Sequence, residues 1–251
     1  MEKVFYFDHA ATTALDKRVL DEMIPYLTNE YGNPSSIYSL GRKSKEAIQI
    51  ARTRVAASIN CKVSEIYFTS GGTESDNLAV KGIAMANRKY GNHIITSKIE
   101  HPAILNSCKA LENLGFRVTY LNVDELGRIR LEELERAITK QTVLISIMFA
   151  NNEIGTIQDI EAIGRIARKY HVFFHTDTVQ AIGNVPIDVR KMNIDSLSMS
   201  GHKFYGPKGI GVLYLRNGIS FFRQNDGGHQ EQDKRSGTEN TAGIVGIRKS
   251  N

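Results

Sequence analysis

Short apolar runs alternate with helical segments through most of the chain, and this alternation is the feature that most constrains the fold. Strands are predicted at 66–69, 93–96, 118–121, 143–148, 172–175, from Ser196 onward, and at 212–215. Helices are predicted from Asp16, at 37–59, from Glu74, from Pro102, at 131–138 and at 160–170. Apolar strands interleaved with helices are typical of a parallel sheet buried on both faces. The sequence therefore predicts an α/β fold with one mostly parallel, seven-stranded sheet covered by helices.

Three segments lie outside this alternation. Residues 4–8 are predicted to be a short extended run. The helix that Asp16 caps is amphipathic, with Val19, Leu20, Met23, Ile24 and Leu27 on one face. Residues 224–237 are polar and contain glycines, which predicts an exposed loop.

A lysine lies among small residues between the last two predicted strands. Lys203 follows Ser200, Gly201 and His202 and precedes a glycine-rich turn, so few bulky side chains would keep a flat ligand away. Desolvation or a neighbouring cation lowers the pKa of an amine, and the neutral amine condenses with an aldehyde. On composition alone the favoured alternative is a solvated surface lysine, because charged side chains are mostly exposed.

An acidic residue lies two positions after the predicted strand at 172–175. Asp177 is expected at the carboxyl end of the sheet, where open α/β sheets bind ligands. A carboxylate there can hold a proton on a ring nitrogen, and Gln180 could donate to a ring oxygen. The simpler interpretation of Asp177 taken alone is a helix cap.

A small-residue turn joins the predicted strand at 66–69 to the next helix. Backbone amides at such a turn, together with the positive end of the helix, form an anion site, so Gly72 and Thr73 are predicted to hold a phosphate. The spacing fits neither the dinucleotide-binding nor the P-loop motif.

Eight segments in order along the whole chain resemble the signatures of cysteine desulfurases of the NifS and IscS type. They are Asp8-His-Ala-Ala-Thr-Thr13, Gly32-Asn-Pro-Ser-Ser36, residues 69–77, Glu100-His-Pro-Ala103, Asn151-Asn-Glu-Ile-Gly-Thr156, His175-Thr-Asp-Thr-Val-Gln180, residues 198–211 and Arg235-Ser-Gly-Thr-Glu-Asn240. The resemblance implies a pyridoxal 5'-phosphate enzyme with the aspartate aminotransferase-like (type I) fold. It also implies an N-terminal arm, residues 1–15, that contributes to a small lobe, and a large cofactor-binding domain, residues 16–251.

The resemblance also implies roles for single residues. Lys203 resembles the lysine that bonds the cofactor and moves the substrate's α-proton, and His101 the residue that stacks on the cofactor ring. Asn152 is similar to a residue that contacts the cofactor and the substrate. Thr73, Ser200 and His202 resemble phosphate ligands. Thr238 resembles a residue that reaches a phosphate in the neighbouring subunit, which implies a homodimer.

The family's substrate is L-cysteine, whose sulfur passes to a cysteine thiolate and then to an acceptor or iron–sulfur scaffold protein. In the family that thiolate, the arginine that clamps the substrate carboxylate and most of the small C-terminal domain lie beyond the point that matches Asn251. We therefore expect a C-terminally truncated chain with poor turnover. Cys108 shares a helical face with apolar residues, and Cys61 matches no family site, so neither is expected to replace the thiolate. Two alternatives remain: another reaction of the same fold, such as selenocysteine lysis or transamination, and an inactive cofactor-binding remnant.

Composition excludes several other classes. Thirty-two basic and 27 acidic residues are interspersed, which indicates no nucleic-acid footprint. The densest basic run, Arg42, Lys43, Lys45, Arg52 and Arg54, is predicted to be the solvated face of a helix. Two cysteines cannot form a disulfide framework or a four-ligand zinc site, so we expect no metal and a reducing, cytoplasmic location. No apolar stretch is long enough to predict a membrane span. Within the family motifs, Asp233 stands where glycine is common, which would stiffen its loop.

Overall fold

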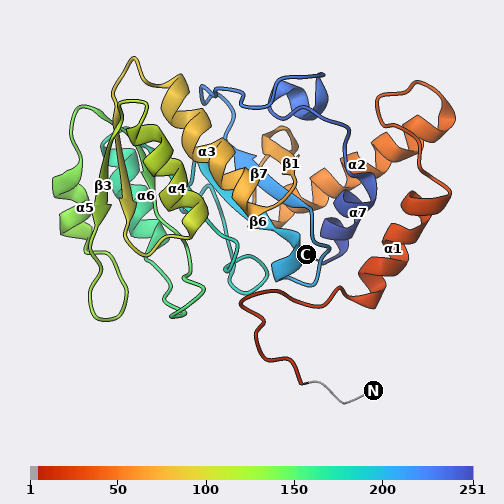
Figure 1. Cartoon of the computed structure of the whole chain (residues 1–251), viewed down its shortest axis with the longest axis horizontal. Helices are drawn as coiled ribbons and strands as arrows, with labels where there is room; N and C mark the ends of the chain where they lie inside the picture. Colours follow the sequence, from red (N-terminus) through yellow and green to blue (C-terminus); the bar gives the residue numbers. More distant parts are fainter. Residues whose placement is uncertain (1–4, 251) are drawn as a thin grey trace.

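The computed structural model describes residues 5–250, with only the backbone described for 248–250, and it confirms the predicted α/β fold (Figure 1). The strands are β1 (Ile66–Thr69), β2 (His93–Ser97), β3 (Arg117–Leu121), β4 (Thr142–Ser146), β5 (Phe173–Asp177), β6 (Ser196–Ser200) and β7 (Gly211–Leu215). The α-helices are α1 (Lys17–Thr28), α2 (Ser39–Ser58), α3 (Gly72–Ala86), α4 (Pro102–Glu112), α5 (Leu131–Ala137), α6 (Ile160–Lys169) and α7 (Thr241–Ser250). Val4 of the predicted extended run lies outside the described residues, and residues 5–8 form no strand.

The seven strands form one sheet in the order β1-β7-β6-β5-β4-β2-β3. All neighbouring pairs from β6 to β3 are parallel, whereas β7 runs antiparallel to both β1 and β6. The sheet is therefore mostly parallel, as predicted. Because parallel strands end at the same edge, the carboxyl ends of β2, β4, β5 and β6 lie together.

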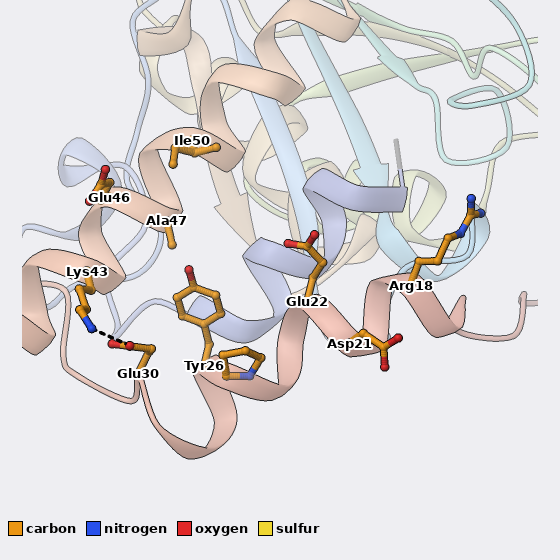
Figure 2. A pocket seen from close by; sticks show the side chains of 10 residues that line it. Arg18, Asp21, Glu22, Tyr26, Glu30, Lys43, Glu46, Ala47 and Ile50 are labelled. Atoms are coloured by element: carbon orange, nitrogen blue, oxygen red, sulfur yellow. Dashed lines mark hydrogen bonds and ion pairs between the residues drawn. The ribbon is translucent and has the colours of Figure 1, made fainter.

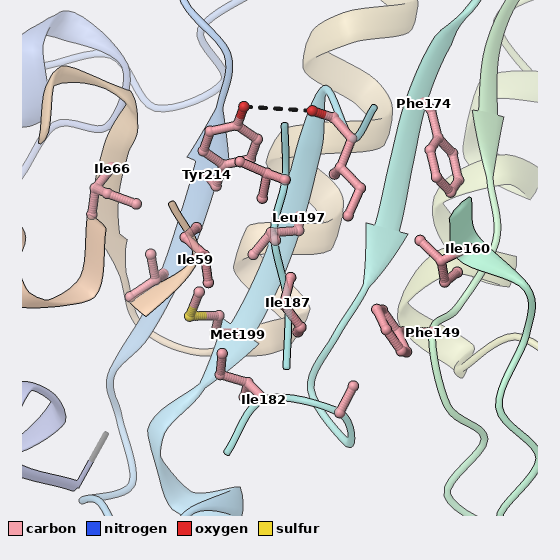
Figure 3. Close-up of a cluster of buried hydrophobic side chains, with 14 of the residues drawn as sticks. Ile59, Ile66, Phe149, Ile160, Phe174, Ile182, Ile187, Leu197, Met199 and Tyr214 are labelled. Carbon is pink, nitrogen blue, oxygen red and sulfur yellow. Dashed lines mark hydrogen bonds between the residues drawn. The ribbon is translucent and has the colours of Figure 1, made fainter. Parts of the chain in front are cut away.

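Helices cover both faces of the sheet (Figure 1). On one face, α3 and α4 pack over apolar side chains such as Ile94 and Leu213. On the other face, α2 and α6 pack over a larger cluster that includes Ile95 and Tyr214 (Figure 3). Adjacent strand residues thus enter opposite cores, which explains why strands such as β2, β4 and β6 are buried along their whole length.

Helix α1 is amphipathic as predicted, but most of its apolar face is not buried. Val19 is fully buried, whereas Leu20, Ile24 and Leu27 are 40%, 44% and 61% exposed. The helix packs against α7, and no described segment covers the rest of its apolar face. None of the helices within residues 5–250 combines the length and apolarity needed to cross a bilayer.

The basic run on α2 is a partial exception to its prediction, because Arg52 is buried and does not belong to a solvated face. Its guanidinium donates to both carboxylate oxygens of Glu231, at 2.6 and 2.7 Å, and to the carbonyl of Ile66 at 2.6 Å. Glu231 belongs to the loop that was predicted to be exposed, yet its side chain is only 2% exposed. Burial of Arg52 is possible because a carboxylate distant in sequence neutralises its charge.

A candidate cofactor site at the carboxyl ends of the strands

A cavity of about 460 Å³ lies at the carboxyl ends of the parallel strands, and it brings together nine of the ten predicted site residues. This volume is typical of a small-molecule site. The nine residues are Gly72, Thr73, His101, Asn152, Asp177, Gln180, Ser200, His202 and Lys203. They come from segments that follow β1, β2, β4, β5 and β6, so the sheet itself assembles the site.

One end of the cavity is the turn between β1 and α3, where an anion was predicted. Gly71 has φ +154°, a backbone conformation that side chains disfavour, and α3 begins at Gly72. A Cβ atom on Gly72 would lie 2.7 Å from Cγ2 of Val179 and 3.4 Å from Cβ of Ser200, so only glycine leaves this cradle open. The first N–H groups of a helix have no partner within the helix and attract anions.

Two side chains from the β6 end complete this part of the cavity. Ser200 is buried, and Nδ1 of His202 lies 2.9 Å from Oγ1 of Thr12. Burial lowers the pKa of His202, and the nearby cations Lys203 and Lys208 lower it further. A neutral imidazole together with a hydroxyl can donate hydrogen bonds to a phosphate.

The buried carboxyl group of Asp177 lies in the same cavity, at the last position of β5. One of its oxygens accepts the N–H of Val179 at 2.8 Å, and Asp177 is only 5% exposed. Burial raises the pKa of Asp177, while that N–H group and the positive charges of His101 and Lys203 oppose the increase. The helix-cap interpretation is wrong, because a turn and not a helix follows Asp177, and its carboxylate faces the cavity.

The half-buried Lys203 ends the 3₁₀ turn Gly201–Lys203 and reaches the same space. Its ammonium group donates to the carbonyl of Ala10 and, at 2.9 Å, to that of Ala11. Burial lowers the pKa of Lys203, against the opposing charges of Asp177 and Asp8. Desolvation, rather than a neighbouring cation, is thus what favours the neutral amine needed for reaction with an aldehyde.

Around the cavity lie three more polar side chains with different hydrogen-bond partners, those of His101, Asn152 and Gln180. His101 is exposed and is the N-cap of α4, where its Nδ1 atom accepts the N–H of Ala103 at 3.1 Å. Asn152 donates to Glu153 at 2.5 Å, and Gln180 donates to the carbonyl of Ala10 at 2.8 Å. All three present polar atoms to a bound ligand.

Thr238 does not belong to this cavity. It lines a separate cavity of about 240 Å³ together with Arg235 and Glu231. Arg235 donates to the carboxylate of Glu74 at 2.8 Å, and Glu74 lies in the first turn of α3, so the loop of Thr238 is attached to the anion turn.

Several cavity residues received no role from sequence, among them Asp8, Ala10, Ala11 and Asp76. The first three lie on the N-terminal segment, where the hydroxyl and N–H of Thr13 donate to the carbonyl of His202 at 3.0 and 2.9 Å. Their motif, Asp8-His-Ala-Ala-Thr-Thr13, was recognised, but no residue pattern shows that this segment folds back over the sheet. Asp76, His101 and Asp177 are the one histidine–carboxylate group within residues 5–250 that is compact enough for a metal, and they lie inside this cavity.

A wider cavity, of about 660 Å³, lies between α1 and α2 (Figure 2). It contains none of the predicted site residues, and an ion pair between Lys43 and Glu30, 2.7 Å long, crosses one end of it. Opposite charges that neutralise each other give no site for a ligand of one sign, and we assign no function to this cavity.

A parallel-sheet fold with a desolvated lysine, a buried aspartate and an anion turn in one cavity defines the class of pyridoxal-phosphate-binding α/β proteins. A family model for aminotransferase class-V matches residues 5–250, and the chain belongs to this family, whose members use pyridoxal 5'-phosphate.

The chain is also similar to proteins of one named activity. It is 58% identical to the cysteine desulfurase IscS of Methanosarcina thermophila, over 99% of this chain and 61% of that protein. It is 56% identical to the cysteine desulfurase IscS of Clostridium botulinum strain Hall, over 100% of this chain and 63% of that protein. Among solved structures, a NifS-like protein matches with a TM-score of 0.96 and 44% identity, over 99% of this chain and 68% of that one. SspA in complex with cysteine also matches with a TM-score of 0.96 and 44% identity, over 98% and 72% of the two chains. The chain thus spans about 61–63% of the length of these IscS relatives.

Proposed function

We propose that this chain carries the cofactor site of a cysteine desulfurase, an enzyme that converts L-cysteine and a protein thiol into L-alanine and a protein persulfide. The observation that supports this most is the single cavity in which Lys203, Asp177 and an anion turn meet. The names of the IscS relatives, and the structure of SspA in complex with cysteine, support the choice of substrate.

The residues of the cavity fit pyridoxal 5'-phosphate in three ways. The cradle at Gly72, with Thr73, Ser200 and His202, would hold the phosphate. Asp177 offers a buried carboxylate to the ring nitrogen, and Lys203 offers an amine with a lowered pKa to the aldehyde. When bound, the cofactor supplies that aldehyde and a ring that takes up the electron pair released when the substrate's Cα proton leaves.

The chain's own residues then hold and move protons. The amine of Lys203, once free, is the group that takes the Cα proton and returns one to form alanine. Asp177 keeps a proton on the ring nitrogen, which costs least when Asp177 itself is ionised. His101, at the exposed rim, is placed to handle the proton of the substrate thiol, while Asn152 and Gln180 orient the substrate and the ring.

The thiol that accepts sulfur is neither of the two cysteines of this chain. Burial raises the pKa of Cys61 and of Cys108 to about 12, which leaves almost no thiolate at neutral pH. Neither cysteine lines the cavity, and Cys108, on α4, is fully buried. The proposed reaction therefore requires a thiol from another segment or another protein, such as an iron–sulfur scaffold.

We further propose a homodimer, in which Thr238 serves the site of the second copy. Its position in a separate cavity supports a role outside its own chain's site. A reducing compartment such as the cytoplasm would suit a reaction between thiols.

Borohydride reduction of the chain with pyridoxal 5'-phosphate, followed by peptide mapping, tests the cofactor site. We expect the label on Lys203, and we expect it to be lost in Lys203→Ala but kept in Lys208→Ala, a matched change at an exposed neighbour. Asp177→Asn should keep the label while slowing α-proton exchange at least a hundredfold, equivalent to about 2.7 kcal/mol of barrier. A label on another lysine in the unaltered chain would contradict the proposal.

A further inference from the structure

Asp76 is a buried carboxyl group in the cofactor cavity for which the proposed reaction has no use. It lies on α3, lines the cavity and is only 1% exposed. Its Oδ1 atom has no hydrogen-bond partner among the described residues. A buried, unpartnered carboxylate oxygen is costly and calls for a physical explanation.

Other acidic side chains lie close to Asp76. Asp76, Asp177 and His101 place their polar atoms within 4.8 Å of one another, and Glu100 is a further buried carboxyl group nearby. His175 Nε2 lies 3.7 Å from Asp76 Oδ1, but burial lowers the pKa of His175 to about 3, so this imidazole is neutral. Two ionised carboxylates at such a separation in a buried site repel each other strongly.

The contacts of the two aspartates decide which one is ionised. Asp177 accepts the backbone N–H of Val179 and faces the ammonium group of Lys203, whereas His101 lies close to both aspartates. The hydroxyl of Ser198 favours the ionised form of Asp76, but Oδ1 of Asp76 has no hydrogen-bond partner among the described residues. Negative charge is therefore better stabilised on Asp177.

We propose that Asp76 is a positioning residue that holds the shared proton of the Asp76–Asp177 pair and so leaves the pair's single negative charge on Asp177. Burial, repulsion from Asp177 and repulsion from Glu100 raise the pKa of Asp76 well above its usual value, in agreement with this assignment. Glu100 is also largely neutral at pH 7, because burial raises its pKa to about 8. The inference rests on the proposed function for its purpose, which is to present one ionised carboxylate to the ring nitrogen.

The difference in the number of bound protons between the folded and unfolded chain tests this assignment, and the measurement needs no cofactor. An aspartate that is protonated when folded and ionised when unfolded makes stability fall as pH rises above the unfolded pKa of about 3.9. Between about pH 5.5 and 7, the unfolding equilibrium constant should therefore rise about tenfold more per pH unit in the unaltered chain than in Asp76→Asn. Urea denaturation across this range measures the difference. Equal slopes would overturn the proposal.

Asp188→Asn is the matched control. Two backbone N–H groups and the amide of Asn60 bind the carboxylate of Asp188, and these contacts lower its pKa. Asp188 is therefore ionised in both states above pH 5.5, and its replacement should lower stability without changing the slope. If Asp188→Asn also changed the pH dependence of unfolding, that dependence would not report the protonation of one aspartate, and the proposal for Asp76 would be overturned.

An infrared measurement detects the protonated carboxyl group directly in the unaltered chain. Chain labelled with ¹³C-aspartate should show the carbonyl band of a protonated aspartic acid near neutral pH. Asp195→Asn should keep this band, because Asp195 pairs with Arg216, whereas Asp76→Asn should remove it. Absence of the band in the unaltered chain would refute the proposal. Neither measurement involves Lys203, so failure of the proposed function and failure of this inference remain distinguishable.

Discussion

Replacing Glu231 with glutamine should destabilise the chain by about 3–5 kcal/mol, the usual cost of removing one partner from a buried ion pair. Its carboxylate accepts two guanidinium N–H groups of Arg52 and the backbone N–H of Phe68 at 2.8 Å. The guanidinium also lies 4.7 Å from the centre of the Phe68 ring. The substitution leaves Arg52 charged and buried without a counter-ion.

The structure adds a second reason for a large effect. Glu231, Gln232 and Asp233 all have positive φ, between 45° and 64°, a conformation that costs about 1–2 kcal/mol per residue without glycine. The ion pair offsets this cost by holding the turn against β1. Asp233, the position at which the resemblance expects glycine, lies in this strained turn.

Urea denaturation followed by circular dichroism measures the effect as a lower midpoint with an unchanged slope. Arg54→Met, at an exposed position on the same helix, is the control and should change stability by no more than about 0.5 kcal/mol. The double change Arg52→Met with Glu231→Leu should recover much of the loss, because no unpaired charge remains. If Glu231→Gln destabilised the chain no more than Arg54→Met, the ion pair would not hold this loop.

Three further predictions concern single groups. The carboxyl of Glu100 is protonated in the folded chain (pKa about 8) and ionises on unfolding, so the unaltered chain should lose up to ~1.4 kcal/mol of stability per pH unit between about pH 5 and 8. Glu100→Gln should abolish this loss, as measured by thermal unfolding, and an equal decline in the variant would contradict the prediction. Gly72→Ala should weaken pyridoxal 5'-phosphate binding about tenfold by fluorescence titration, and Val179→Ala should restore part of it, because the new Cβ would meet Val179 at 2.7 Å; no recovery would show that this contact is not the cause. Iodoacetamide should alkylate Cys61 slowly at pH 7 and Cys108 more slowly still, as followed by mass spectrometry, because both thiols have a pKa of about 12 and only Cys108 is fully buried; rapid alkylation of Cys108 would refute its burial.

The sequence predicted the strands because local pattern determines them. Local pattern also indicated five of the nine cavity residues, whereas His101, Asn152, Ser200 and His202 came from the family resemblance alone. Each strand is a short apolar run that ends in polar or small residues, and parallel strands bring those ends together. The burial of Arg52 could not be predicted in this way, since it depends on Glu231, far away in the chain. Asp76 was missed for a similar reason: a helical aspartate is usually solvated, and only the packing of α3 against the sheet buries it.

The antiparallel strand β7 has a consequence for how the protein is made. Among the described residues, β1 lies at the edge of the sheet and pairs only with β7. Ile66 therefore has no strand partner until Tyr214 has been synthesised. A ribosome adding ~5–20 residues per second needs on the order of ten seconds to supply that partner. During this interval β1 is an apolar edge open to mispairing, and Gly72 remains apart from Lys203. Cofactor capture therefore cannot begin until Lys203 has been made, and a chaperone that shields β1 on the nascent chain should raise the yield of protein able to bind the cofactor.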